Sequence, residues 1–268
     1  MAMTIASVAS LWRYPVKSMM GEEISSTGLS EHGLIGDRMY ALIDRITGKI
    51  ASAKNPRKWP DMFKFSAALT APPDGSEIPP VRITTPDGVD LISGTDEVDR
   101  VLSQVLKREV MLQSQAPEAP SLEQYWPDME DQPQGEKVTD EAMPTTSFFD
   151  CGTVHLLTAA TLKRLAEFYP EGSFQMRRFR PNIFLDTPQE GFAENSWVGR
   201  TLAIGPEVRL VITQKTGRCV MTTLPQGELP KDLGILRCAA QHNGGHVGVY
   251  ASVISGGTIR SGDSVSFV

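Results

Sequence analysis

The thiol of Cys219 offers the most specific chemistry in this chain. It lies in the run 215–223 (KTGRCVMTT), directly after the apolar, strand-like segment 208–213. A thiol attacks substrates or binds metals as the thiolate, and the permanent cation of Arg218 beside it favours that form. Gly217 lets the backbone approach a bulky ligand closely. The alternative is that Cys219 is an ordinary small apolar residue of the core.

Three other segments place cationic and hydroxyl groups at expected strand ends or loops. They are residues 12–18 (WRYPVKS), 33–38 (GLIGDR) and 177–183 (RRFRPNI). Because the guanidinium fork of arginine matches phosphate oxygens, such groups suit a phosphate-bearing ligand if the fold brings them together. Each segment by itself is equally compatible with a turn or a solvated basic surface.

Composition and charge narrow the class of protein. The chain is 40% hydrophobic and 22% charged, and its net charge of −6 argues against general nucleic-acid binding. The sequence shows neither a membrane-spanning apolar stretch nor a signal peptide. Three irregularly spaced cysteines do not form a disulfide framework. We therefore expect a cytoplasmic protein that does not bind a membrane.

The acidic charge is concentrated in one segment. Residues 116–144 hold eight acidic residues and one basic residue, a net of −7, so the rest of the chain carries +1. A basic pocket for an anion is therefore compatible with the remainder. The segment also contains five prolines, which makes it a poor helix or sheet and predicts a connecting segment over 116–146.

Strand patterns dominate on both sides of this segment. Before it, residues 39–43 with 49–53 and residues 81–85 with 89–92 are typical of two hairpins. After it, we expect strands at 182–185, 201–204, 207–213, 245–255 and 264–268. Two helices are expected, one beginning near Thr95 with an apolar face over 98–105, and one capped by Thr158 and stopped by Pro170. Short strands with few helices indicate a mainly β protein with a barrel or sandwich core.

A second metal-like pattern is less persuasive. Cys238, His242 and His246 have C-x3-H-x3-H spacing, which resembles a zinc site. Two glycines lie between the histidines, however, and they disfavour the helix that would present both rings on one face. We therefore do not expect zinc here.

Five segments together resemble a known family. Residues 11–19 (LWRYPVKSM), 33–38 (GLIGDR), 178–183 (RFRPNI), 217–223 (GRCVMTT) and 257–263 (GTIRSGD) occur in this order. They resemble the MOSC family, in the branch that has an N-terminal β-barrel region and includes the mitochondrial amidoxime-reducing component and its bacterial relatives. The resemblance implies an N-terminal β-barrel or α+β region over 1–115, a connecting segment over 116–146 and a MOSC β-barrel over 147–268.

The resemblance also implies a molybdenum cofactor (Mo-molybdopterin). Cys219 falls on the position that supplies the metal-binding thiolate, and it is therefore also a catalytic residue. By resemblance the cofactor phosphate is held by basic and polar residues, which are Lys17, Ser18, Arg38, Arg180, Asn182 and Arg218. Gly217, Cys151 and Gly152 stand where relatives have Ser, Thr and Ser, so backbone N–H groups must replace those hydroxyls. Asp150 is a second catalytic candidate, for proton delivery or water positioning, and the alternative is a turn cap.

The expected reaction is a two-electron reduction of N-hydroxylated compounds such as amidoximes, hydroxylamines or N-oxides. Three cysteines cannot hold a plant-type iron–sulfur cluster, so we expect a separate electron-donor protein of ferredoxin, flavin or cytochrome b5 type. Two alternatives remain open. Cys219 would act as a nucleophile or persulfide in sulfur transfer, or the protein would carry the cofactor without turnover.

Overall fold

The computed structural model describes residues 3–73, 79–95, 97–128, 135–145 and 147–268. It divides the chain into two compact units. Unit 1 consists of Met1–Trp12, Glu23–Ile35 and Gly152–Val268, and unit 2 consists of Arg13–Glu22 and Gly36–Cys151. Among the described residues, no helix has both the length and the apolar character needed to cross a membrane.

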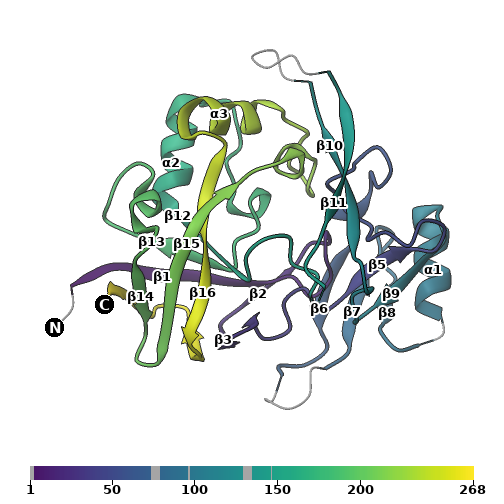
Figure 1. Ribbon diagram of the computed structural model, residues 1–268, viewed down its shortest axis with the longest axis horizontal. Helices are drawn as coiled ribbons and strands as arrows, with labels where there is room; N and C mark the ends of the chain where they lie inside the picture. The colour runs from purple at the N-terminus through teal and green to yellow at the C-terminus, as the bar shows by residue number, and fades with distance from the viewer. Residues whose placement is uncertain (1–2, 74–78, 96, 129–134, 146) are drawn as a thin grey trace. The chain divides into compact units, whose positions relative to one another are not determined.

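Unit 1 is built on a closed β-barrel. Within the described residues its strands follow one another around the barrel in the order β13 (Ile183–Asp186), β12 (Val154–Thr158), β16 (His246–Ser255), β15 (Val208–Gly217), β14 (Thr201–Ile204), β18 (Ser264–Phe267) and β1 (Thr4–Arg13). The barrel closes because β1 also pairs antiparallel with β13, with Leu11 opposite Ile183. Figure 1 shows the purple N-terminal β1 among green and yellow strands from the other end of the chain.

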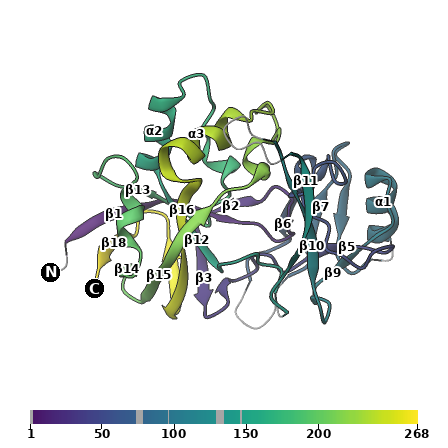
Figure 2. The same ribbon diagram turned by 45° about the horizontal axis from the view of Figure 1, so that its top comes forward.

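Alternating side chains fill the barrel. Val208, Leu210 and Ile212 of β15 are fully buried, as the two-residue period of a strand requires, and they belong to one apolar cluster with Trp197. Strand β15 runs antiparallel to β16 along most of its length, and the two lie side by side in Figures 1 and 2. The mainly β fold expected from the sequence is confirmed.

Two helices pack together on unit 1 (Figure 2). Helix α2 (Ala159–Phe168) begins as predicted, since the Thr158 hydroxyl accepts a hydrogen bond from the Thr161 backbone N–H at 3.2 Å. Helix α3 (Gly234–Asn243) was not expected from the sequence, and it ends at the left-handed Gly244. Unit 1 also contains short 3-10 turns: Met176–Arg178 (η2) follows α2, Ala193–Trp197 (η3) follows β13 and Val220–Thr223 (η4) follows β15.

The remaining strands of unit 1 form a small sheet. It consists of β17 (Gly257–Arg260), β3 (Ser26–Ser30) and β4 (Gly33–Leu34), in that order. A short strand, β2 (Glu22–Ile24), pairs with β1. Segments 4–12 and 23–35 therefore belong with the C-terminal barrel, whereas the sequence patterns had grouped them with an N-terminal region. The reason is that their partners in the sheets, β13, β17 and β18, lie more than half the chain away in sequence.

Within the described residues, unit 2 contains several small antiparallel sheets, one α-helix and a 3-10 turn at Met62–Lys64 (η1). The strands pair as β5 (Ala41–Asp44) with β9 (Val110–Gln113), and as β6 (Ser66–Leu69), β7 (Val81–Thr84) and β8 (Asp90–Ile92) in order. The predicted hairpin of β7 and β8 is confirmed, and so is helix α1 (Glu97–Leu106). In the other predicted hairpin, residues 49–53 form no ladder with β5, because β5 takes β9 as its ladder partner; Ile50 makes isolated bridges to Ile43 and to Leu122.

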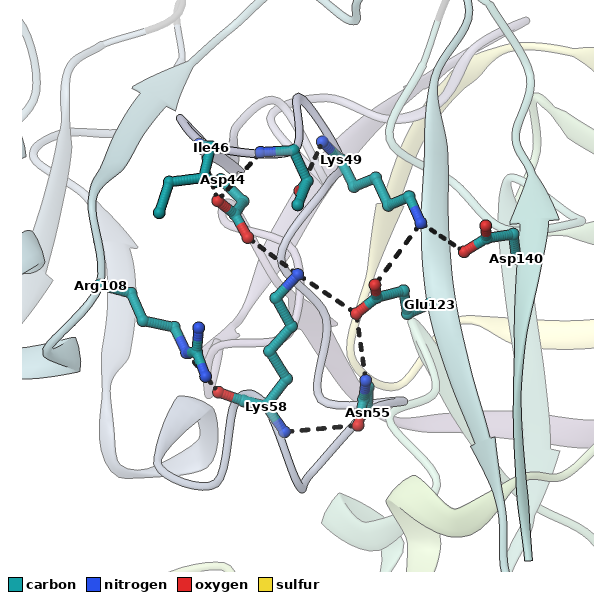
Figure 3. A network of polar contacts seen from close by, with 9 residues as sticks. Asp44, Ile46, Lys49, Asn55, Lys58, Arg108, Glu123 and Asp140 are labelled. Atoms are coloured by element: carbon teal, nitrogen blue, oxygen red, sulfur yellow. Dashed lines mark hydrogen bonds and ion pairs between the residues drawn. The ribbon is translucent and has the colours of Figure 1, made fainter.

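The acidic segment is part of unit 2, and the expectation that it forms a poor sheet is wrong. It holds an antiparallel hairpin of β10 (Ser121–Trp126) and β11 (Lys137–Ala142), while residues 129–134 and 146 lie outside the described residues. Figure 3 shows how the acids are neutralised. Glu123 lies 3.5 Å from the Lys49 ammonium and 3.3 Å from that of Lys58, and Lys49 also pairs with Asp140 at 2.6 Å. Lysines earlier in the chain therefore offset the acidic charge.

Candidate functional site

Cys219 lies between the end of β15 and the first residue of η4, in extended backbone conformation. Its carbonyl accepts hydrogen bonds from the Thr222 backbone N–H at 3.2 Å and from the Thr222 hydroxyl at 3.0 Å. The side chain is half-buried, and its thiol makes no hydrogen bond to any residue in the described part of the chain. The backbone is thus fastened while the sulfur stays available to a ligand.

The other two cysteines are in different surroundings. Cys238 is buried in α3, where its thiol donates to the Leu165 carbonyl at 3.6 Å and burial raises its pKa. Cys151 is exposed. Among the three, Cys219 alone combines partial burial with a thiol that bonds to no described residue, which suits a metal ligand.

The zinc pattern is not assembled. His242 stacks on the ring of Phe168 at 3.8 Å, and a ring nitrogen of His246 contacts the Asn243 carbonyl at 3.2 Å. Among the described residues, no group of three or more His, Cys, Asp or Glu side chains is placed to hold a metal ion. Cys238 and His242 do share a helix, but one side chain is buried against α2 and the other is stacked.

Arg218 is anchored close to Cys219 at both its backbone and its side chain. Its backbone N–H donates to the Gly245 carbonyl at 2.8 Å, and its guanidinium donates to the Phe179 carbonyl at 2.6 Å. The guanidinium carbon lies 5.6 Å from the centre of the Phe179 ring, a cation–π distance. Arg218 therefore connects the Cys219 segment to the arginine-rich segment before β13.

Arg180 is held in an unusual backbone conformation within that segment. It is buried to 7% exposure and has a φ of 55°, in the left-handed region. Its carbonyl lies 3.3 Å from one ring nitrogen of His155, whose other ring nitrogen lies 3.3 Å from the Val247 carbonyl. His155 therefore helps to hold Arg180.

Asn182 fastens three strands of the barrel. Its side-chain oxygen accepts from the His155 backbone N–H at 3.1 Å, and its side-chain nitrogen donates to the Trp12 carbonyl at 3.3 Å. The backbone of Asn182 also pairs with both residues. The carboxamide thus positions the start of β13, and its direct contact with a cofactor stays a prediction.

Two glycines near these residues differ in the space around them. A Cβ atom added at Gly217 would meet no heavy atom within 4 Å, so the backbone beside Cys219 faces open space. A Cβ added at Gly152 would lie 2.5 Å from the Tyr250 ring. The serine hydroxyl of relatives is therefore sterically compatible with position 217 but not with position 152 unless Tyr250 moves.

Unit 2 holds its own cluster of charged groups. The Lys17 ammonium is buried and donates to the Asp150 carboxylate at 2.6 Å and to the Phe148 carbonyl at 2.8 Å. Lys54, which sequence reasoning did not single out, pairs with the second oxygen of Asp150 at 3.1 Å. One carboxylate is thus shared by two ammonium groups.

The charge state of this cluster follows from its geometry. Burial by itself raises the pKa of Asp150, but the ammonium groups of Lys17 and Lys54 outweigh it and hold that pKa well below its ordinary value. Burial also lowers the pKa of Lys17, although Asp150 opposes that effect. An ionised Asp150 has no proton to donate near neutral pH, and within the described residues its carboxylate contacts lysines rather than capping a turn.

Ser18 and Arg38 complete the predicted residues of unit 2. The Ser18 hydroxyl accepts a hydrogen bond from the Ala53 backbone N–H at 3.1 Å. Arg38 forms an ion pair with Asp37 and lies 4.7 Å from the centre of the Tyr14 ring. Both side chains are thus held by neighbours within their own unit.

Left-handed backbone marks three of the predicted site residues. Among the described residues, four residues other than glycine have positive φ: Ser18 (64°), Arg38 (47°), Arg180 (55°) and Lys107 (55°). This conformation costs about 1–2 kcal/mol for a residue with a Cβ, and such strain concentrates at functional sites. Lys107 has an ordinary explanation, since it follows the last residue of α1.

Two family models match this chain. The MOSC N-terminal beta barrel domain matches residues 5–119, and the MOSC domain matches residues 144–266. The chain belongs to the MOSC family. A curated relative, mitochondrial amidoxime reducing component 2 of Rattus norvegicus, is 25% identical over 246 residues, which cover 82% of this chain and 67% of the relative.

Two solved structures also match the chain. The YUAD protein from Bacillus subtilis has 12% identity, a TM-score of 0.49 and coverage of 99% of this chain and 96% of its own. YiiM from Geobacillus stearothermophilus has 20% identity and a TM-score of 0.34, with coverage of 44% of this chain and 54% of its own.

The predicted site residues fall in both MOSC segments. Lys17, Ser18 and Arg38 lie in the MOSC N-terminal segment. The residues in the MOSC domain are Asp150, Cys151, Gly152, Arg180, Asn182, Gly217, Arg218 and Cys219. Their roles toward a cofactor stay predictions, whereas the structure shows how each is held.

Sequence reasoning missed three residues that hold the predicted ones. Lys54 shares Asp150 with Lys17, His155 contacts the Arg180 carbonyl, and Arg178 is buried behind the Cys219 loop. Arg178 had a signal, since it belongs to the same arginine-rich run as Arg180. Lys54 and His155 had none, because their partners are remote in sequence.

Proposed function

We propose that this MOSC protein binds a molybdenum cofactor through Cys219 and reduces N-hydroxylated compounds. The observation that carries the proposal is the environment of Cys219: a half-buried thiol free of hydrogen bonds to described residues, beside a glycine whose Cβ position is open. A soft thiolate suits a soft metal centre. The similarity to mitochondrial amidoxime reducing component 2 supports the choice of reaction class.

The residues present fit such a cofactor. Open space at Gly217 leaves room for a bulky group beside the thiol, and Arg218 and Arg180 supply cations close to that segment. Arg180 belongs to the same unit as Cys219 and has a left-handed backbone, and because strain of this kind concentrates at functional sites it supports the proposal. When bound, the cofactor would supply the two-electron chemistry that oxygen abstraction requires.

The residues of the protein would bind the metal and the anionic groups of the cofactor. Cys219 would hold the metal as a thiolate, which requires loss of its proton. Arg218 and Arg180 would bind anionic oxygens of the cofactor. The overall reaction takes an N–OH compound, two electrons and two protons to the N–H compound and water. Asp150 would hold Lys17, and as an ionised carboxylate it could position water or pass on a proton accepted from solvent rather than donate one of its own.

The electrons require a partner. The chain has three cysteines, and the one buried in α3 is hydrogen-bonded within the fold, so four thiolates for an iron–sulfur cluster are lacking. We therefore propose a separate donor protein of ferredoxin, flavin or cytochrome b5 type.

The first experiment is the molybdenum content of the protein, measured by elemental mass spectrometry after expression in a host that makes the cofactor. About one atom per chain is expected for the wild type and for Cys238→Ala, a control that removes the thiol buried in α3. Cys219→Ser should lose most of the metal and keep its fold by circular dichroism. Equal metal in Cys219→Ser and the wild type, or no metal in either, would overturn the proposal.

Turnover then separates enzyme from carrier. Oxidation of reduced methyl viologen by benzamidoxime should depend on Cys219. A fully loaded protein that reduces no amidoxime, hydroxylamine or N-oxide would favour the cofactor-carrier alternative. A metal-free protein whose Cys219 accepts a persulfide would favour sulfur transfer.

A further inference from the structure

Arg178 is a charged residue buried with no exposed surface, in η2 just before the Arg180 segment. Its guanidinium donates to four backbone carbonyls. These belong to Ser173 at 2.9 Å, Thr222 at 3.2 Å, Leu224 at 3.1 Å and Pro230 at 2.8 Å. Within the described residues it contacts no carboxylate. All of its hydrogen bonds go to backbone carbonyls, while the carboxylate of Asp232 opposes the effect of burial on its pKa from beyond contact distance.

Three of these carbonyls belong to the loop that follows Cys219. Thr222 and Leu224 lie at the end of η4, and Pro230 lies where the chain returns toward α3. The loop is also closed on itself, because the backbones of Gln226 and Leu229 exchange hydrogen bonds at 3.1 and 3.0 Å. The guanidinium therefore binds both the outgoing and the returning side of one loop.

The loop is connected directly to Cys219. The Thr222 residue whose carbonyl accepts from Arg178 also donates its N–H and its hydroxyl to the Cys219 carbonyl. On the other side, the backbone N–H of Arg218 is fixed to Gly245. The backbone is thus held by hydrogen bonds on both sides of Cys219, through Arg218 before it and Thr222 after it. The contact of Thr222 depends on Arg178.

A buried cation with no carboxylate in contact is unfavourable for stability, so its retention points to a role in geometry. Only arginine offers five N–H donors in a rigid plane, enough for four carbonyls around one group. Lysine has three donors on one atom and cannot bridge both sides of the loop.

We infer that Arg178 is a positioning residue for Cys219: it clamps the 222–230 loop and thereby sets the burial of the thiol. The inference deepens the proposed function, on which it rests for the role of Cys219 as metal ligand. The clamp itself is a property of the cofactor-free chain and is tested there.

The test measures alkylation of Cys219 by iodoacetamide in metal-free protein, followed at each cysteine by peptide mass spectrometry. Exposed Cys151 in the same molecule is the internal reference. Arg178→Lys should speed alkylation of Cys219 relative to Cys151 by about tenfold, the change in loop opening expected when a hydrogen bond to a charged group is lost. Arg164→Lys, on the exposed face of α2, is the matched control and should change nothing.

A second variant covers the case in which Arg178→Lys does not fold. Thr222→Val keeps the carbonyl that Arg178 binds but removes the hydroxyl bond to Cys219, and it should also speed alkylation, while Thr222→Ser should restore the wild-type rate. Unchanged Cys219 reactivity in the folded variants would overturn the inference. Absence of molybdenum in the wild type would overturn the proposed function instead, and leave the alkylation result standing.

Discussion

Replacing Arg180 by glycine and by alanine separates the strain in its backbone from the function of its side chain. Both substitutions remove the guanidinium, so the two variants differ by a single Cβ. Arg180 has a φ of 55°, where that Cβ is unfavourable. The glycine variant is therefore expected to be the more stable of the two, the reverse of the usual order.

The size of the difference follows from two opposing effects. A left-handed backbone costs a residue with a Cβ about 1–2 kcal/mol relative to glycine. Glycine loses more conformational freedom on folding, which costs about 0.5–1 kcal/mol relative to alanine. The net advantage of Arg180→Gly over Arg180→Ala is therefore about 0–1.5 kcal/mol, with a mid-range value of about 0.75 kcal/mol.

Urea unfolding monitored by circular dichroism measures this difference, and elemental analysis measures the metal. Both Arg180 variants should bind less molybdenum than the wild type, and to the same extent, because both lack the cation. Lys107 provides the control: it shares the φ of 55° but is exposed at the end of α1. Lys107→Gly should exceed Lys107→Ala in stability by a similar amount, with molybdenum unchanged.

Two results would refute this reasoning. If Arg180→Ala is at least as stable as Arg180→Gly, the backbone there is not strained. If the Arg180 variants retain full molybdenum, the side chain does not hold the cofactor and the strain needs another explanation.

Three further outcomes are expected. Asp150→Asn should lower the free energy of unfolding at pH 7 by roughly 2–3 kcal/mol, less than for a fully buried pair because the Asp150 side chain is 29% exposed. The neighbouring lysines hold the pKa of Asp150 below its ordinary value, so the wild type should lose this advantage progressively as the pH falls below about 4, where the unfolded chain takes up the proton that the folded carboxylate still excludes; equal acid sensitivity of both proteins would contradict it. Glu194 is fully buried, and burial raises its pKa although two threonine hydroxyls donate to it. Its contribution to stability is therefore complete below its ordinary pKa and is lost as the pH rises through the raised pKa. Glu194→Gln should exceed the wild type in stability at pH 8 and match it near pH 5, and a difference in stability that does not change with pH would argue against this. Gly217→Ser should change the free energy of unfolding by less than about 0.5 kcal/mol and keep the metal, since its Cβ meets nothing within 4 Å; loss of metal would show that the cofactor needs the whole of the open space at this position.

Local patterns in the sequence predicted the elements whose formation depends on local residues. The cap at Thr158, the turn between β7 and β8 and the alternating apolar residues of β15 are all read within a dozen residues, and all form as expected. The ordered motifs around Lys17, Arg180 and Cys219 likewise indicated the family from the sequence.

Predictions were wrong where the structure of a segment depends on partners far away in the sequence. The proline-rich acidic segment forms a hairpin because Lys49 and Lys58, more than sixty residues earlier than their partner Glu123, neutralise it. The composition of the segment indicates that its acidic side chains repel one another, but it does not include the lysines elsewhere in the chain that offset this repulsion. The same limit hid α3, whose apolar face is buried against α2.

The sequence by itself determined which residues carry chemistry: one thiol beside a cation, and cationic groups in ordered motifs. Only the tertiary structure decided their states. It left Cys219 half-buried with a fastened backbone, held Asp150 ionised between Lys17 and Lys54, and placed Arg178 in the loop behind the thiol. The physical reason is that protonation, burial and strain are set by groups close in space, and in this fold those groups come from remote parts of the chain.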